Sequence, residues 1–396
     1  MRRRLIALAC LAALTAGLMY SVPARAQVGG PLTVQVGSFV SQVGEGMRFY
    51  SPTLKVESGQ VLNFQSEGFH TATVIPANED VHAWAADNVS GVGKPYSLAV
   101  PDVDDNTEAG GTAEEPALKA NNAVILPSDF TCGFSPGNAC DYDGTTVVNS
   151  GVPTSGPMDF SVAINASPGD TVWVICLVHP HMRLRIEVVA DPAEATMQSA
   201  IDSFFETWTA FDGDWAAAKH EAMKNKRSSH MTESGRVWDS WVGYDNHWVS
   251  LLAMYPAKLK VRKGDTVRYH FDGMVYEDHT ATFPASLARP EAGRTFVPGC
   301  DPDGDAGAGP DGPPENEVTI CNNPANIEFD IQPDFAYERG NGVFRGGDYE
   351  NSGVRGAGFA PRVDSWDLKF AKRSGDKPFK YICMIHPFML GKVVVK

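Results

Sequence analysis

The sequence is poor in basic residues and, after its first four positions, contains no basic run. Its 396 residues include 33 Lys and Arg against 48 Asp and Glu, which gives a formal net charge of −15. Affinity for phosphate backbones comes from clustered Lys and Arg, so this balance argues against nucleic acid as a partner. The apolar run Leu5–Leu18 is shorter than the roughly 20 residues that span a bilayer. We therefore expect no membrane span.

The composition favours a loop-rich β protein with more than one domain. A chain of 396 residues exceeds the size at which a single core stops growing. The 38 Gly and 27 Pro residues exceed what a helical bundle needs, while charged residues make up 20% and aromatic residues 10%. These values also exclude intrinsic disorder over most of the chain.

The first 26 residues have the pattern of a secretory signal. Arg2–Arg4 precede the apolar run, and Ala24–Ala26 form a small-x-small cleavage site before Gln27. Cys10 lies within the segment that would be removed. We therefore predict a secreted or periplasmic protein. Without residues 1–26, which hold four Arg and no acid, the net charge becomes −19.

Three sequence landmarks occur twice in the same order. The pairs are Leu54–Val61 with Leu259–Thr266, His70–Thr73 with His279–Thr282, and Cys176–Met182 with Cys383–Met389. Such matched order is economically explained only by a tandem duplication. The first pair has the pattern of two strands around a Gly turn. We predict one domain over residues 27–190, a connector over 191–234 and a second domain over 235–396.

The connector has the signals of a helix. Asp191 is a candidate N-cap, followed by Pro192 and by Glu194 in the first turn. Apolar residues then recur at helical spacing as far as Phe211. Gly213 predicts a break, followed by a second helix to about residue 226. We expect a packed connector that fixes the orientation of the two domains.

Each repeat carries a set of side chains suited to binding a metal. One His lies far upstream, and a Cys, a second His and a Met follow in one short loop. The candidate ligands are His70, Cys176, His179 and Met182 in the first repeat and His279, Cys383, His386 and Met389 in the second. Two imidazoles, a thiolate and a weak axial thioether are the ligands of a blue-copper site, whereas structural zinc sites rarely use a thioether. The sequence therefore predicts two copper sites.

On these residues the chain resembles two tandem cupredoxin domains, with ligand loops most similar to those of amicyanin and plastocyanin. The loop CMIHPFM at Cys383–Met389 matches closely, while CLVHPHM at Cys176–Met182 has His181 at the aromatic position. The resemblance implies a mainly β fold of two Greek-key β-sandwiches joined by the short helical connector. It implies two type 1 copper sites that transfer single electrons.

The resemblance carries further expectations. His179 and His386 would lie nearest the surface, where electrons enter and leave. Thr71 and Thr280 depart from the family, because Asn commonly follows the first His there.

The remaining four cysteines are then expected to form disulfides in an oxidising compartment. The pairs would be Cys132 with Cys140 and Cys300 with Cys321. The segment Asp301–Gly307 has alternating carboxylates like a calcium loop, but its Gly is misplaced for an EF-hand. A solvated turn is therefore favoured over calcium.

We expect an exported electron-transfer protein rather than an enzyme. Its partners would be redox proteins, which the sequence does not identify. The alternatives are a two-domain copper oxidase or nitrite reductase, or a periplasmic copper store or delivery protein. Those enzymes connect the blue site to a second copper centre through a His adjacent to the Cys ligand. The neighbours here are Ile175 and Leu177 in one loop and Ile382 and Met384 in the other. The 12 Met residues are dispersed, unlike those of a copper store.

Overall fold

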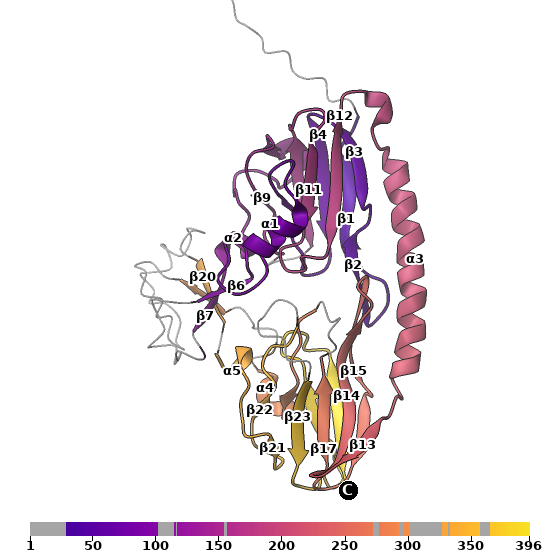
Figure 1. Ribbon diagram of the computed structural model, residues 1–396, viewed down its shortest axis with the longest axis vertical. Coiled ribbons are helices and arrows are strands. Elements are labelled where there is room, and N and C mark those ends of the chain that lie inside the picture. Colours follow the sequence, from indigo (N-terminus) through magenta and orange to yellow (C-terminus); the bar gives the residue numbers. More distant parts are fainter. Residues whose placement is uncertain are drawn as a thin grey trace, which may run out of the picture.

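The computed structural model describes residues 29–101, 115, 117–153, 157–271, 277–290, 292, 297–300, 327–331, 333–356 and 365–396. The predicted signal sequence, Cys321 and the segment Asp301–Gly307 lie outside these residues. Figure 1 shows two β-rich bodies, one above the other, with a long helix along one side. No helix among the described residues is long and apolar enough to cross a membrane.

The first half of the chain forms a sandwich of two sheets. One sheet has the order β2 (Gly44–Phe49), β1 (Leu32–Phe39), β4 (Gln60–Ser66), β10 (Met158–Ile164) and β8 (Cys140–Tyr142). The other has the order β3 (Thr53–Glu57), β12 (Arg183–Val189), β11 (Thr171–Ile175), β5 (Thr73–Val74) and β9 (Val148–Asn149). Successive strands cross between the sheets, as in a Greek-key sandwich.

The second half repeats this topology strand for strand. One sheet has the order β15 (Val249–Tyr255), β14 (Gly235–Asp245), β17 (Thr266–His270), β23 (Ser365–Phe370) and β21 (Val343–Phe344). The other has the order β16 (Lys258–Val261), β25 (Leu390–Val395), β24 (Phe379–Ile382), β18 (Thr282–Phe283) and β22 (Glu350–Asn351). The mainly β fold is thus confirmed, and the two halves share one strand order.

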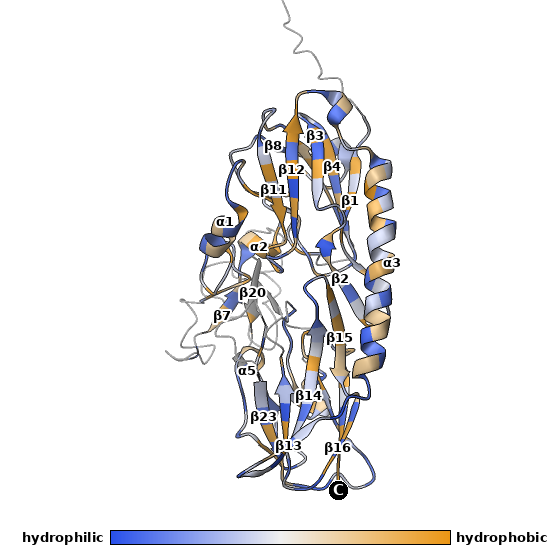
Figure 2. Cartoon of the chain, turned by 45° about the vertical axis from the view of Figure 1, so that its right-hand side comes forward, coloured by the Kyte–Doolittle hydropathy of each residue, from blue (hydrophilic) through white to orange (hydrophobic). Residues whose placement is uncertain are grey.

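The strands follow from alternating hydropathy. In β12 the buried Leu184, Ile186 and Val188 alternate with half-buried polar or apolar neighbours, so one face of the strand meets the core. Figure 2 shows this alternation as orange and blue bands. Each half has its own core, and each core includes the Cys and the Met of its predicted ligand loop. The ligand loops are therefore anchored in the sandwiches.

Among the described residues, two strand pairings join the halves. Strand β2 pairs antiparallel with β15, with Glu45 opposite Ser250, so one 11-stranded sheet runs through both halves. The inserted segments also pair, in a sheet of β6 (Ala99–Pro101), β7 (Leu118–Ala120), β20 (Ile327–Ile331) and β19 (Val297–Cys300). The short elements are α1 (Val81–Asn88), α2 (Asn122–Ile125), α4 (Ala285–Ala288), α5 (Pro333–Ala336) and β13 (Ser229–Thr232).

The connector differs from its prediction. Asp191 caps only a 3-10 turn at Pro192–Glu194, and a single helix, α3, then runs unbroken over Gln198–Met223. The predicted break at Gly213 is wrong. A Cβ atom there would lie 3.0 Å from the carbonyl oxygen of Val40, so glycine lets the helix approach the loop after β1.

A buried ion pair fastens α3 to the first sandwich. Arg48 on β2 donates to Asp212 of α3 at 2.8 Å, and the Tyr50 hydroxyl donates to the other carboxylate oxygen at 3.3 Å. The Arg48 guanidinium lies 4.6 Å from the ring centroids of both Trp208 on α3 and Trp248 in the second half. One guanidinium therefore contacts the helix and both halves of the chain.

One of the two expected disulfides lies within the described side chains. Cys132 and Cys140 are bonded, while Cys176 and Cys383 are free and buried. The disulfide fixes the insert of the first half to β8.

Candidate metal centres

Each predicted ligand set is assembled by equivalent elements of its sandwich. In the first half, His70 lies between β4 and β5, and Cys176 directly follows β11. His179 and Met182 lie in the loop that returns to β12. In the second half the corresponding positions lie between β17 and β18 and in the β24–β25 loop. The repeat thus builds two similar centres, which we name site 1 and site 2.

The ligand atoms of each site converge on one point. In site 1 the Cys176 Sγ atom lies 3.9 Å from His70 Nδ1 and 3.7 Å from His179 Nδ1, and the two Nδ1 atoms are 3.0 Å apart. In site 2 the three corresponding distances are 3.9, 3.7 and 3.2 Å. Ligand atoms held about 2.0–2.3 Å from a common ion lie at about these separations from one another. The donor set and its spacing therefore fit a bound metal ion.

Hydrogen bonds and a lowered thiol pKa favour the thiolate form of both cysteines, which binds cations. The backbone N–H groups of Thr71 and His179 donate to Cys176 Sγ at 3.3 and 3.4 Å, and site 2 repeats both contacts at 3.4 Å. Burial raises the pKa of the Cys176 and Cys383 thiols, but contacts with the two neighbouring imidazoles outweigh it and lower each pKa to about 5. Both are thus thiolates at neutral pH, the form that binds metals.

The two methionines close the ligand loops. Met182 and Met389 are buried, and each backbone carbonyl accepts a hydrogen bond at 3.2 Å from the N–H of the Cys in its own loop. Their role as axial thioether ligands stays a prediction.

A hydrogen-bonded chain behind each sulfur was missed by the sequence analysis. The Thr71 hydroxyl accepts from the N–H of Leu177 at 2.8 Å and contacts Thr73, which donates to Asn149 at 2.8 Å. The equivalent residues of the second half are Met384, Thr280, Thr282 and Asn351. The repeated sequence Asn-Ser-Gly-Val, at 149–152 and 351–354, is the signal that could have revealed it. Threonine after the first His therefore holds the next residue of the Cys loop.

Glycine lets the first His of each site pack against the backbone. Gly37 and Gly243 have φ values of 66° and 75°, and a Cβ atom on either would lie within 2.4 Å of Nε2 of His70 or His279. A side chain at these positions would displace a ligand imidazole.

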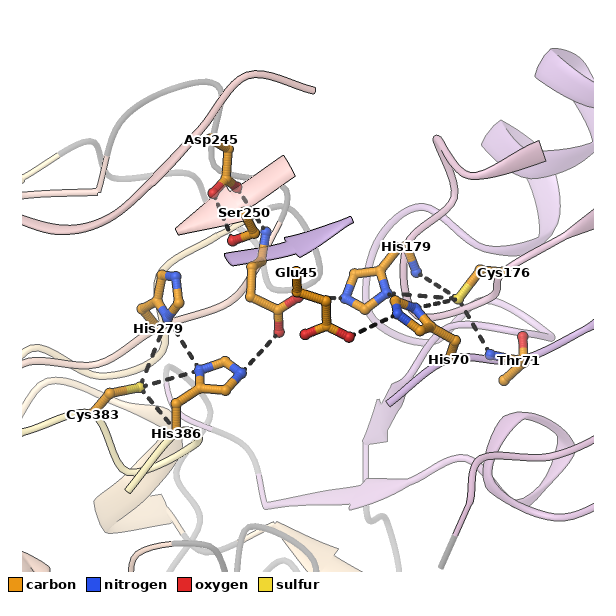
Figure 3. Close-up of polar contacts among 11 residues, drawn as sticks. Glu45, His70, Thr71, Cys176, His179, Asp245, Ser250, His279, Cys383 and His386 are labelled. Carbon is orange, nitrogen blue, oxygen red and sulfur yellow. Dashed lines mark hydrogen bonds and ion pairs between the residues drawn. The ribbon is translucent and has the colours of Figure 1, made fainter. Parts of the chain in front are cut away.

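Within each site, His179 or His386 is the most exposed of the four predicted ligands, as expected, but neither lies open to solvent. His179 is 3% exposed, and the side chain of His386 is 14% exposed. Figure 3 shows the two imidazoles directed toward each other across the boundary between the halves. The imidazole edge of His179, which was expected to face solvent, is covered because the second half of the chain packs against it.

Glu277 connects the two sites. Its carboxylate oxygens lie 2.7 Å from His179 Nε2 and 3.3 Å from His386 Nε2. Its backbone N–H donates to Asp245, whose side chain also accepts from Ser250. Burial raises the pKa of the Glu277 carboxyl, but the two imidazoles outweigh it and hold the pKa well below its usual range. One buried carboxylate therefore serves a ligand of each site.

A second carboxylate makes the sites unequal. Glu45 lies 3.0 Å from His70 Nε2. The strand register places Ser250 at the equivalent position in the second half, where it bonds to Asp245 instead. Among the described residues, His279 Nε2 has no hydrogen-bond partner. Carboxylates behind a ligand imidazole raise its basicity, so site 1 is the more electron-rich of the two.

We expect the substitution Glu45→Gln to weaken metal binding at site 1 by about tenfold or more, because it removes the charge behind His70. Site 2 should change less than twofold. Competition titration measures each affinity in chains whose other site is removed by Cys383→Ala or Cys176→Ala. The matched control is Ser250→Ala, which alters the equivalent position without touching a ligand. An unchanged site 1 affinity in Glu45→Gln would contradict this reading.

His181 replaces an exposed aromatic residue with a half-buried imidazole. Its ring centroid lies 6.3 Å from that of His179 and 5.2 Å from that of His247. Burial and the neighbouring imidazoles lower the pKa of His181 to about 2, so it is neutral. It borders a pocket of about 540 Å³ that Arg48 and Arg183 also line. At the equivalent position in site 2, Phe388 is 59% exposed.

No family model matches this chain, and no curated protein matches it. Among solved structures, dithionite-reduced auracyanin from Roseiflexus castenholzii matches at 13% identity and a TM-score of 0.21, over 41% of this chain and 98% of that chain. Auracyanin A, a "blue" copper protein from Chloroflexus aurantiacus, matches at 17% identity and a TM-score of 0.20, over 40% and 99%. Copper nitrite reductase from Nitrosomonas europaea matches at 11% identity and a TM-score of 0.19, over 93% and 94%. Because these identities and TM-scores are low, the support for the two metal centres comes from the donor atoms of this chain.

Proposed function

We propose that the protein is an exported electron-transfer protein that carries two type 1 copper ions. The observation that carries the proposal is the pair of buried clusters, each with two imidazole nitrogens and one thiolate. A His2Cys set followed by a Met in the same loop suits both oxidation states of copper, because thiolate favours Cu(I) and imidazole tolerates Cu(II). When bound, copper would supply one-electron chemistry.

The chain's own residues would hold the ion and limit rearrangement. His70, Cys176 and His179 would bind it in site 1, and Met182 would be the axial ligand. In site 2 these roles fall to His279, Cys383, His386 and Met389. The Thr–Thr–Asn chains and the backbone N–H groups hold each sulfur, and burial excludes water. A site that keeps its geometry in both oxidation states exchanges electrons quickly.

Charge supports a cation at both sites. Five acidic groups are buried between or within the two sites: Glu45, Asp245, Glu277 and the thiolates of Cys176 and Cys383. Buried charges are costly unless they are paired or bind metals. Burial lowers the pKa values of His70, His179 and His386, but the neighbouring acidic groups outweigh it and raise them, so these imidazoles pair with the acidic groups when no metal is bound. Two bound cations would take over this pairing.

A carrier is favoured over a copper enzyme. Within the described residues, the two sites are the clusters of three or more His, Cys, Asp or Glu ligands that could hold an ion, so no third centre is found there. The residues beside each Cys are apolar and buried, which gives no adjacent His for a link to another centre. We place the domains at 27–190 and 235–396, with the connector between them and residues 1–26 as the export signal.

The loop of site 2 is the proposed contact for redox partners. Phe388 is 59% exposed, and its ring centroid lies 5.9 Å from that of His386. An exposed aromatic ring beside a ligand gives a partner an apolar point of contact.

The copper-loaded, oxidised protein should contain two coppers per chain and show an intense visible band from thiolate-to-copper charge transfer. Metal analysis and the visible spectrum measure both. Oxygen consumption with a phenolic donor, and nitrite reduction, should stay at the level of free copper. Turnover well above that level would favour the enzyme, and a colourless copper-loaded protein would exclude type 1 sites.

A further inference from the structure

The carboxylate of Glu277 is shared between two ligand imidazoles from different halves of the chain. One oxygen faces His179 Nε2 at 2.7 Å and the other faces His386 Nε2 at 3.3 Å. Glu277 is 7% exposed, and its backbone is held by Asp245. This carboxylate therefore has both imidazoles as partners and little access to solvent.

The contact fixes which nitrogen of each imidazole is available to a metal. An ionised carboxylate only accepts hydrogen bonds, so Nε2 of both His179 and His386 carries a proton. Each Nδ1 atom, which faces the thiolate, is then the nitrogen that a cation would bind in place of a proton. Glu277 thus orients one ligand of site 1 and one ligand of site 2 together.

This bridge is not inherited from the repeat. Gly68 occupies the position in the first half that Glu277 occupies in the second, two residues before the first His. A Cβ atom at Gly68 would lie 1.9 Å from a carboxylate oxygen of Glu45, so glycine leaves space for Glu45. The chain therefore places one carboxylate between the sites instead of one in each half.

We propose that Glu277 couples the two sites, so that a cation bound at one lowers the metal affinity of the other. The proposal deepens the proposed function, since it takes both sites to be metal centres. A cation at Nδ1 of His179 withdraws electron density from the ring and strengthens the donation of Nε2–H to Glu277. The carboxylate then has less negative charge to offer His386, whose imidazole becomes a poorer ligand. The same argument holds in the opposite direction, because coupling between two binding sites is reciprocal.

The test uses Co²⁺ as the probe, so it does not depend on whether the protein carries copper in the cell. Absorption titrations give the overall constant for binding two ions to the parent chain. They also give the single-site constants in Cys383→Ala and Cys176→Ala. Independent sites would give an overall constant equal to the product of the two single-site constants. We expect the overall constant to be lower by about fivefold or more, the smallest effect typical of linked sites.

The cycle is then repeated with Glu277 replaced. In Glu277→Ala each single-site constant should fall by about 10–100-fold, since a group that supports a ligand is lost at both sites. The overall constant should then lie closer to the product of the two single-site constants. The difference that remains should be the part caused by direct repulsion between the two cations. Glu277→Gln keeps the volume and one hydrogen bond but not the charge, so it should also lose the coupling without a large change in stability. Glu67→Gln, which neutralises an exposed carboxylate in the loop before His70, should behave like the parent.

A metal-free measurement completes the test. In the apo protein, Glu277→Gln should shift the Nε2–H resonances of both His179 and His386, whereas Glu67→Gln should shift neither. An overall constant of the parent chain that equals the product of the two single-site constants would overturn the proposal. So would an overall constant that stays equally far below this product in both Glu277 variants. Failure of the proposed function would instead appear as a copper-loaded parent without a visible charge-transfer band, whatever the cobalt constants show.

Discussion

The substitution Cys383→Ser should remove one of the two coppers and, with it, the visible band of site 2. The thiolate is the only sulfur donor with a formal negative charge in that site, and a neutral hydroxyl cannot give the charge transfer that colours such sites. Metal analysis should fall from two coppers per chain to one. The remaining spectrum should belong to site 1, whose ligands all come from the first half.

The reciprocal variant Cys176→Ser is the matched control. It should also retain one copper, with a spectrum that differs from the first because His181 and Phe388 surround otherwise equivalent loops. The contact through Glu277 allows the band of the surviving site to move slightly, but not to disappear. A single substitution that empties both sites would show that they are one shared centre, and the two-site carrier would have to be abandoned.

The substitution Asp212→Ala should destabilise the protein by about 3–5 kcal/mol, the cost of leaving one partner of a buried ion pair alone. The side chains of Arg48 and Asp212 are 8% and 1% exposed, so little water can reach the guanidinium to replace the lost carboxylate. Tyr50 would lose its partner as well. Chemical denaturation followed by tryptophan fluorescence measures the free energy of unfolding.

Asp214→Ala is the control for this change, because Asp214 is exposed on the same helix. Its effect should stay within about 0.5 kcal/mol, as for most surface substitutions. Asp212→Asn should fall between the two, since an amide can still accept from Arg48 but carries no charge. Equal stability of Asp212→Ala and Asp214→Ala would mean that the stacking of Arg48 between Trp208 and Trp248 suffices to hold it.

The repeat made the fold and most of the candidate site predictable. His70, Cys176 and His179 are up to 109 positions apart, yet their repetition in the same order indicated that they meet. The structure brings these residues and their second-half counterparts together. The repeated Asn-Ser-Gly-Val segments carried the same kind of signal for the chain behind each sulfur.

The features that the sequence did not predict lie at the boundary between the halves, where the two repeats differ in sequence. Glu45 and Glu277 have Ser250 and Gly68 as counterparts, so no internal match marked them. Burial of His179 could not be predicted because it results from the packing of one half on the other. Gly213 illustrates the same limit, since its low helix propensity is outweighed by close contact between α3 and the loop after β1.

The pairing of β2 with β15 has a consequence for ancestry. The strands are equivalent and antiparallel around Glu45 and Ser250, so a local two-fold axis passes through this point. A symmetric dimer of first halves would set one Glu45 directly against another, and like charges opposite each other destabilise a sheet. A dimer of second halves would bring two copies of Glu277 to a pair of imidazoles that one carboxylate satisfies. In a single chain the two halves can differ at these positions. Glu45 therefore faces Ser250 instead of a second Glu45, and Glu277 has Gly68 as its counterpart instead of a second Glu277.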